Sequence, residues 1–358
     1  MKVFTQQDLL TTNTIFMSTL QRFCGIDVSS STLDFIVLSN SDNTRLSAKA
    51  ISGKSKEFEQ IPNTLDAIQT KFSQCEFDQT LFVLEATGTY SSKLLYQLSK
   101  LNRPISVVSP YQSKSYMASK GITNKNDKNA AFCLAAMGKN EELRLYKAPK
   151  IEMQHRKQIF STYRALQKQE RSLSNQIHAL EQYPEVNQIA LSSLQQVLEQ
   201  VTQQLESLEE QLYQPSQDPA YKEKMEHGTS VIGIGNKTAE AILLATNGLE
   251  GFETAGAVAK CLGITPSSHR SGKSVNRKGG ITKFGNNTVR GLLYMCTRSA
   301  IQHNKACKEL YYRLRAKGKP HKVAAVAVMN KLVKQFFACV HFKRMFDNDY
   351  HMKQQANK

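Results

Sequence analysis

The stretch CGIDVSSSTLDFIVLS, residues 24–39, decides the fold of the first part of the chain. Apolar residues lie on both sides of the polar segment SSST, which is the pattern of two strands joined by a tight turn. Asp27 stands inside the first of these strands, between Ile26 and Val28. A carboxylate in an apolar strand is costly unless a cation or a hydrogen-bond donor is paired with it. The stretch therefore predicts a β-hairpin and marks Asp27 as a candidate functional residue.

Strand and helix patterns alternate from this hairpin to residue 110. TLFVLEATG (80–88) and PISVVSPY (104–111) predict buried strands, and SSKLLYQLSKLN (91–102) predicts a helix. KEFEQIPNTLDAIQTKF (56–72) has apolar residues at helical spacing, so we expect a helix over this segment. Strands separated by helices after an opening hairpin predict a mixed α/β layer fold.

Heptad spacing of apolar residues predicts long helices over 151–213. The first half carries Ile159, Tyr163, Leu166, Leu173, Ile177 and Leu180, and after the break at Tyr183–Pro184 the second carries Leu191, Leu194, Leu198, Val201, Leu205, Leu208 and Leu212. Steps of three and four residues are typical of a coiled-coil seam. A helix pair folded on itself and a coiled coil between chains both fit, and the unbroken second seam favours self-association. QPSQDP (214–219) is interpreted as a linker.

The charge of the chain predicts a polyanionic partner. With 358 residues, two or three domains are expected, and the formal net charge is +17. From Thr254 to Lys308 the chain has no Asp or Glu but ten Lys or Arg: 260, 270, 273, 277, 278, 283, 290, 298, 305 and 308. A solvated basic face is the alternative, but surfaces usually mix both signs. The segment therefore predicts a phosphate-binding surface, and nucleic acid is the expected partner.

Cysteines and apolar runs narrow the setting. The seven cysteines are odd in number and form no CxxC pair, which favours a reducing cytosol and argues against a zinc site or a disulfide framework. No apolar run approaches the roughly 18–20 residues of a membrane span, so we expect no membrane partner. Residues 1–22 lack the pattern of a signal peptide. We expect a flexible extension there, with Met17 as a possible start.

Three carboxylates form a candidate metal-binding set. Asp27 lies in the first strand, Glu85 ends the strand of TLFVLEATG, and Asp127 stands at the start of a helical pattern. Acids on neighbouring strands, joined by one from a helix, suit Mg²⁺, which prefers oxygen ligands and keeps waters and substrate phosphates in its shell. Paired ions of this kind promote phosphodiester chemistry. Singly, the three residues also fit a turn-bonding group, a strand-end surface group and a helix cap.

The blocks GIDVSSSTLDFIVL, LEATGTY and SVVSPYQSKSYMASKGITNKNDKNAAFCLA resemble the amino-terminal domain of IS one-ten and IS eleven-eleven insertion-sequence transposases, a group that includes Piv-type DNA invertases. The resemblance resumes at HGTSVIGIGNKTAEAILLATNG and continues through ITPSSHRSGKSVNRKGGITKFGNNTVRGLLYMCTRSA to KGKPHKVAAVAVMNKLVKQFF. It implies a RuvC-like variant of the ribonuclease H fold with a D-E-D-D metal-binding set. By resemblance, Asp27, Glu85 and Asp127 are the first three ligands.

The fourth acid of this set is missing. The family usually reads Lys-Thr-Asp-x-x-Asp-Ala, whereas residues 125–131 read KNDKNAA, so Ala130 stands where the last aspartate belongs. On a helix, positions 127 and 130 share a face, while Asn129 is turned away from it. An engineered replacement and a recent natural lesion both fit. The intact remaining blocks argue against general decay, and we prefer the engineered interpretation.

The second half carries two candidate nucleic-acid elements. In VIGIGNKTAEAILL (231–244), Gly233 and Gly235 open a helix whose amides could hold a phosphate, and the look is that of a helix-hairpin-helix element; a plain helix entry fits equally. In SSHRSGKSVNRKGGITKFGNN (267–287), serines lie among cations; a serine attacks phosphorus only if its proton is removed and the developing charge is offset. A phosphate-gripping loop is the reading from chemistry alone. The predicted nucleic-acid-binding residues are Gly233, Gly235, Lys260, Arg270, Lys273, Arg277, Lys278, Lys283 and Arg290.

The resemblance adds a mechanism to these elements. The family carries a Ser-Gly in the second block, and the matching Ser271 is the implied nucleophile for a covalent link to DNA, with Ser274 in reserve. The family also binds a structured non-coding bridge RNA that pairs with donor and target DNA, so that base pairing chooses the sequence. We expect the acid site and Ser271 to meet between protomers of a homodimer or homotetramer. The expected place is the bacterial cytoplasm, with nucleoid association when DNA is bound.

The leading hypothesis is an RNA-guided, Mg²⁺-assisted DNA recombinase, impaired at Ala130. The alternatives are a RuvC-like structure-specific endonuclease, in which water attacks, and an inactive nucleic-acid-binding protein. The expected parts are an extension (1–22), an α/β RuvC-like catalytic domain (23–148), an α-helical coiled coil (149–213), a linker (214–226), a mostly α-helical carboxy-terminal transposase domain with the serine nucleophile (227–346) and a tail (347–358).

Overall fold

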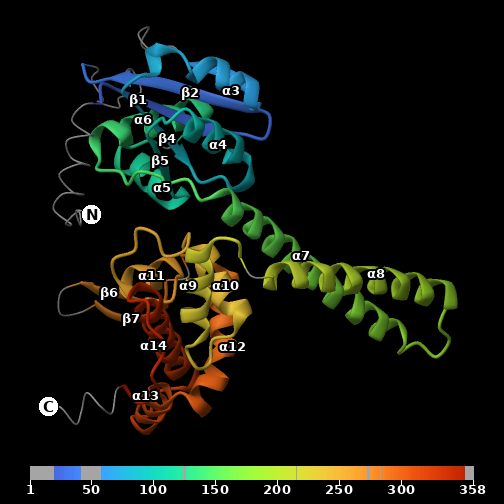
Figure 1. The fold of residues 1–358 in the computed structure, drawn as a ribbon. Coiled ribbons are helices and arrows are strands. Elements are labelled where there is room, and N and C mark those ends of the chain that lie inside the picture. The colour runs from blue at the N-terminus through green and yellow to red at the C-terminus, as the bar shows by residue number, and fades with distance from the viewer. Residues whose placement is uncertain are drawn as a thin grey trace, which may run out of the picture. The chain divides into compact units, whose positions relative to one another are not determined.

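The computed structural model describes residues 20–41, 58–122, 124, 126–214, 216–271, 275–282 and 284–350, with the backbone alone for 267–271 and 275–279. The chain divides into two compact units, Met1–Ala148 and Pro149–Lys358. Figure 1 gives the labels of the helices and strands in both units.

The first unit is built on a five-stranded mixed sheet. Its strands are β1 (Arg22–Val28), β2 (Thr32–Ser39), β3 (Glu59–Pro62), β4 (Thr80–Glu85) and β5 (Ile105–Val108), in the order β3-β2-β1-β4-β5. β1 and β2 form the predicted antiparallel hairpin, and β3 extends it on the far side of β2. β4 and β5 run parallel to β1. The strands predicted over 80–88 and 104–111 are thus confirmed in position.

The helices of this unit are α3 (Leu65–Phe72), the short η1 (Cys75–Phe77) and η2 (Gly88–Ser91), α4 (Ser92–Lys100), α5 (Pro110–Ser119) and α6 (Asp127–Asn140). The prediction of a helix over 56–72 is wrong for Glu59–Pro62, which form β3. Pro62 offers no backbone N–H to a helix interior. The Thr64 hydroxyl then accepts a hydrogen bond from Ala67 N, which places the helix start after Pro62.

Alternation along the strands gives the sheet two buried faces. One face packs Ile26, Phe35 and Phe82 against α3 and α4, where phenylalanine rings meet edge to face. The other packs Phe23 and Val83 against α6.

The close approach of α6 depends on Gly25 in β1. A Cβ atom at Gly25 would lie 2.0 Å from the carbonyl oxygen of Ala131 and 2.2 Å from the amide nitrogen of Ala135. No side chain fits there without moving the helix. Gly25 therefore sets the distance between α6 and the sheet.

The second unit is mostly helical, with a two-stranded ribbon. Its elements are α7 (Ile151–Leu180), α8 (Gln188–Tyr213), α9 (Pro219–Thr229), α10 (Asn236–Ala245), α11 (Ala255–Cys261), β6 (Pro266–Ser271), β7 (Val275–Ile281), α12 (Asn287–His303), α13 (Lys305–Ala316) and α14 (His321–His341). Residues 219–226, expected as linker, form the first turns of α9. The polar, glycine-containing segment that interrupts the helices of this unit forms the β6–β7 hairpin.

Helix α14 corrects the expectation that no segment approaches a membrane span. In the described part of the chain it alone is long and apolar enough, with a mean hydropathy of 1.5 over its best window. Its apolar residues, among them Val328, Leu332 and Phe336, are fully buried in the core of the second unit. A buried core helix passes the same test of length and composition.

The heptad segment folds as a helical hairpin within one chain. α7 and α8 pack against each other (Figure 1), and Tyr163, Leu205 and Leu212 are buried near the root of the hairpin. Farther out, Leu191 and Leu198 are only partly buried. The helix pair folded on itself is therefore present, and a coiled coil between chains stays a prediction.

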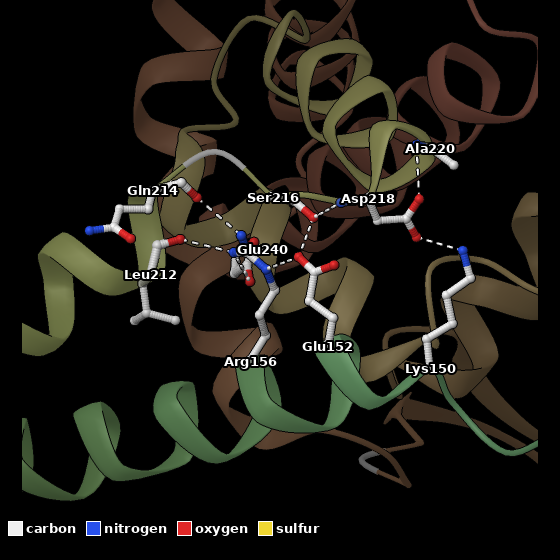
Figure 2. Close-up of polar contacts among 9 residues, drawn as sticks. All are labelled: Lys150, Glu152, Arg156, Leu212, Gln214, Ser216, Asp218, Ala220 and Glu240. Carbon is white, nitrogen blue, oxygen red and sulfur yellow. Dashed lines mark hydrogen bonds and ion pairs between the residues drawn. The ribbon is translucent and has the colours of Figure 1, made fainter.

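Arg156 of α7 anchors this hairpin to the helical core. Its guanidinium donates to the carbonyl oxygens of Leu212 (3.1 Å) and Gln214 (3.0 Å) at the end of α8, and it pairs with Glu240 of α10 at 3.4 Å. Figure 2 shows these contacts converging on one buried side chain. The ring of Tyr221 in α9 lies against this guanidinium, and the Arg156 Cζ atom is 5.1 Å from the centroid of the tyrosine ring. Arg156 thus joins four helices.

The predicted linker is tied to the same place. Ser216 donates to Glu152, which also accepts from Arg156 Nε at 3.4 Å (Figure 2). Lys150 and Asp218 form an exposed ion pair at 2.6 Å. The segment after α8 is therefore held at several points to the start of α7.

Candidate active site

Asp27 and Glu85 lie side by side at one end of the sheet. In the parallel β1–β4 pair, Ile26 is in register with Leu84, so each acid follows directly at the carboxyl end of its strand. Neighbouring residues in register point to the same face of a sheet. Both side chains are partly exposed. The strands that sequence analysis predicted thus bring the first two acids together.

Helix α6 begins at the same end. Gly138 near its end lies against Val83 and Phe23, whereas Ala131 near its start lies over Gly25, so the helix is antiparallel to β1. Its first residue, Asp127, is therefore one turn farther toward Asp27, on the face that carries Gly25. The Asn126 side chain accepts from Asn129 N at 2.7 Å and fixes where the helix begins.

Position 130 faces the protein interior at this end. Ala130 is 4% exposed, whereas Asp127 is exposed. The Asn129 side chain donates to the carbonyl oxygen of Asn124 at 2.9 Å, so it is engaged within the loop that precedes α6. The sequence-based view that Asn129 is a poor substitute for the missing acid agrees with this contact.

Asp34 is an acid of this region that sequence analysis missed. In the antiparallel β1–β2 pair, Asp27 is directly opposite Asp34, so both belong to the face that α6 covers. Asp34 is 3% exposed and accepts a 2.7 Å hydrogen bond from Gln60 of β3. Its signal was its place in TLDFIVL, where it interrupts an apolar strand as Asp27 does.

The donor chemistry of the site suits Mg²⁺, because all candidate ligands are carboxylates. Within the ranges that the structure describes, however, no group of three or more His, Cys, Asp or Glu side chains lies in a position to hold a metal ion. The structure thus brings the backbone positions of Asp27, Glu85 and Asp127 to one end of the sheet without forming a closed ligand set.

Ser271 lies at the tip of a hairpin in the second unit. It is the last residue of β6 and pairs with Val275, the first residue of β7. Gly272, Lys273, Ser274 and Lys283 lie outside the described residues, and so do the side chains of Ser271, Arg270, Arg277 and Lys278. Along the ribbon, Arg277 is opposite His269 and Lys278 opposite Ser268. The backbone therefore gathers these cationic positions on one short ribbon with Ser271.

The two glycines of the Gly-Ile-Gly turn differ in surroundings. Gly233 has φ +102° and lies under α12, where a Cβ atom would come within 2.9 Å of Ala300 Cβ. Gly235 is exposed, caps the start of α10, and has open space around its Cα. A helix does begin at this turn, as expected, with Gly233 serving close packing.

The predicted cations Lys260 and Arg290 also differ. Lys260 is exposed at the end of α11. Arg290 donates to the carbonyl oxygen of Gly285 at 3.0 Å and to Asn287 at 3.1 Å. Its guanidinium thus holds the loop before α12.

Comparison with known proteins places both halves in one family. A family model of DEDD-type IS110 transposases matches residues 24–183, and a second model, of the IS116/IS110/IS902 transposase family, matches residues 226–312. The chain belongs to the IS110 (IS one-ten) transposase family. The first match contains Asp27, Glu85 and Asp127, and the second contains Ser271.

Named relatives agree with this assignment. The pilin gene-inverting protein of Moraxella bovis is 28% identical over 272 residues, covering 75% of this chain and 82% of the relative. The transposase for insertion sequence element IS1111A of Coxiella burnetii is 25% identical over 257 residues, covering 64% and 69%. The predicted resemblance is confirmed, and the chain is an enzyme of the transposase and recombinase class.

Proposed function

We propose that this chain is an insertion-sequence transposase that cuts and rejoins DNA through a Mg²⁺-assisted serine nucleophile. The observation that carries the proposal is the gathering of Asp27, Glu85 and the start of α6 at one end of the sheet. The family match over both units supports the reaction class. DNA is the substrate that this class implies.

The sheet supports a ribonuclease H-like, RuvC-type fold for the first unit. An antiparallel hairpin leads into two parallel strands, in the order β3-β2-β1-β4-β5, and Asp27 and Glu85 lie at the carboxyl ends of the neighbouring strands β1 and β4. Catalytic groups on strands are held more rigidly than groups on loops.

Asp27, Glu85 and Asp127 would hold the metal, which lowers the barrier by stabilising charge on the phosphate oxygens. An aspartate at position 130 would lie on the buried side of α6, one turn from Asp127. Ala130 offers no oxygen, so the set binds Mg²⁺ less firmly and the protein as it stands cleaves DNA poorly.

Ser271 would attack the phosphorus of the DNA backbone. Its Oγ forms the new P–O bond, the bond to the leaving sugar oxygen breaks, and the hydroxyl proton passes to that oxygen, leaving a phosphoserine link that a second attack can reverse. The cationic ribbon around Ser271 offsets the charge that develops on the phosphate.

A bridge RNA would choose the donor and target sequences by base pairing. The acid-free segment 254–308 supports binding through the backbone of nucleic acid, and the open start of α10 at Gly235 supports a helix-hairpin-helix contact. Joining several strands requires a homodimer or homotetramer, for which the partly exposed seam leucines of α8 provide a surface. The work would take place in the bacterial cytoplasm, on the nucleoid.

The test restores the missing acid. Ala130→Asp, with Mg²⁺, partner RNA and DNA, should cleave DNA and form a protein–DNA adduct that denaturing gels detect. Ala130→Asp with Ser271→Ala should bind the same nucleic acids and form no adduct.

Metal-dependent cutting without an adduct would select the RuvC-like endonuclease instead. If Ala130→Asp binds the nucleic acids but cleaves nothing, the site of four acids is rejected, and the hypothesis of an inactive nucleic-acid-binding protein remains. An adduct that survives Ser271→Ala would move the nucleophile, with Ser274 tested first.

A further inference from the structure

A basic surface continues beyond the acid-free segment of the second unit. Glu309 is followed by a second run, from Leu310 to Phe346, without Asp or Glu. That run contains nine Lys or Arg: 313, 315, 317, 319, 322, 331, 334, 343 and 344. It forms most of α13, the turn after it and α14. A surface of one sign over such a length attracts polyanions.

Four large apolar side chains are exposed around the start of α14. Tyr294 and Met295 of α12, Tyr312 of α13 and Val323 of α14 are 37%, 58%, 57% and 52% exposed. Single exposed apolar side chains are ordinary, but Tyr294 and Tyr312 are linked to each other through His321 and Tyr311, which marks these two as parts of one surface.

His321 fixes the aromatic part of this group. Tyr311 Oη lies 2.8 Å from His321 Nδ1, and Tyr294 Oη lies 3.5 Å from His321 Nε2, so the imidazole bridges two hydroxyl groups. Tyr312 packs edge to face on Tyr311, with ring centroids 5.4 Å apart. The rings are thus held in place although they are open to solvent. We name Tyr294, Tyr311, Tyr312 and His321 the Tyr–His surface.

Cations surround the Tyr–His surface. Arg298 follows Tyr294 by one turn of α12, and it is exposed. The turn KGKPHK (317–322) places exposed Lys317, Lys319 and Lys322 beside His321. Arg315 is committed locally, because it donates to the carbonyl oxygen of Lys319 at 2.8 Å and shapes that turn.

From these observations we infer that the Tyr–His surface binds unpaired nucleotides of a single-stranded nucleic acid. Exposed rings stack on bases, which only single strands offer freely, and the flanking lysines contact phosphates. A duplex hides its base faces, so it engages the lysines alone. The exposed Glu309, three residues before Tyr312 on α13, is an acid at this surface, but the surrounding lysines and arginines outnumber it, which favours a polyanion over a protein partner. None of the four residues belongs to the β6–β7 ribbon that carries Ser271, and the inference needs no cleavage.

The test measures binding by fluorescence anisotropy. The probes are a single-stranded DNA of about 12 nucleotides, the RNA of the same sequence and the corresponding DNA duplex. Tyr294→Ala with Tyr312→Ala should weaken single-strand binding by about 10- to 100-fold and leave duplex binding and the salt dependence unchanged. Comparing the DNA and RNA arms identifies which single strand is preferred.

Matched variants separate stacking from charge. Tyr312→Phe keeps the ring and should bind like the original protein, and Tyr183→Ala, which removes an exposed tyrosine from the hairpin tip, should have no effect. Lys317→Gln with Lys322→Gln should flatten the salt dependence for every probe. Tyr312→Ala alone removes a largely exposed ring and should not disturb folding, so it tests the inference even if the double variant is misfolded.

Equal binding of single strands by the alanine variants and the original protein would overturn the inference. An equal loss of affinity for duplex and single strand would also overturn it. So would alanine variants that bind nucleic acid normally but differ from the original protein in molecular mass by light scattering, because that result would assign the surface to a protein contact. A failed adduct at Ser271 leaves these binding results unaffected.

Discussion

Asp27 and Glu240 are both acids inside apolar sequence, yet the two units use them differently. Asp27 lies near the carboxyl end of β1 beside Glu85, partly open to solvent and opposite a second acid, Asp34. Glu240 is 1% exposed in α10 and is paired with Arg156. Asp27 thus lies among other acids at one end of the sheet, whereas Glu240 lies beside a buried cation. The surroundings, and not the apolar neighbours, distinguish the two roles.

The strongest way to break the Asp27 side of this comparison is Gly25→Val. The new side chain would collide with the backbone of α6, so we expect the first unit to lose more than about 5 kcal/mol and fail to fold. Since the chain has no Trp, far-ultraviolet circular dichroism in urea is the measurement. Gly291→Ala in α12, where a Cβ has open space, is the control and should be neutral or stabilising. A folded Gly25→Val variant would contradict the close packing of α6.

The Glu240 side is tested by Arg156→Met. Removing the cation leaves a buried carboxylate, so the second unit should lose about 3–5 kcal/mol in urea unfolding at neutral pH. Lys150→Ala, which breaks the exposed pair with Asp218, should change nothing measurable. Equal effects of the two variants would mean that Arg156 is no more than a surface pair.

The stability that Arg156→Met loses should also depend on pH. Burial raises the pKa of Glu240 above its usual 4.5, against the opposing charge of Arg156. A raised pKa in the folded state gives stability below about pH 4.5 that is lost as pH rises through the folded value. Without Arg156 that pKa rises further, so the deficit of Arg156→Met should shrink in acid and grow toward neutral pH.

The smallest effect is expected for Asp27→Asn. Removing one of two opposed carboxylates should leave the metal-free protein equally stable, or more stable by less than about 1 kcal/mol. Mg²⁺ should raise the melting temperature of the original protein and not that of the variant. Asp66→Asn at the exposed start of α3 is the control and should keep the Mg²⁺ response. A large loss of stability would show that Asp27 serves the fold as Glu240 does.

Local pattern predicted most of the first unit and little of the second unit's tertiary structure. The β1–β2 hairpin could be predicted because alternation and the SSST turn agree. β3 was missed because Phe58 and Ile61 also fit a helical period, and only Pro62 argues otherwise. The β6–β7 segment is polar and contains glycine, so it has no alternation of apolar residues that would predict its strands.

The residues of the candidate sites divide in the same way. Asp27 and Glu85 could be brought together from sequence because both belong to predicted strands of one sheet. Arg156 and Glu240 are 84 residues apart, and the sequence around either residue does not predict that the two form an ion pair. The Tyr–His surface draws on three helices, and its bridging His321 opens α14 in a stretch that sequence marks only as basic. Long-range contacts of this kind have no local signature.

The helical hairpin has a practical consequence for where the chain can be opened. Its root is held by Arg156 and by the buried Tyr163, Leu205 and Leu212, whereas Tyr183 at its tip is 65% exposed. The covalent connection at the tip therefore adds little to what already keeps α7 and α8 together. A protease cut, an inserted tag or new chain termini between Tyr183 and Pro184 should leave both segments paired, so the tip is the natural point for splitting the protein into two co-expressed halves.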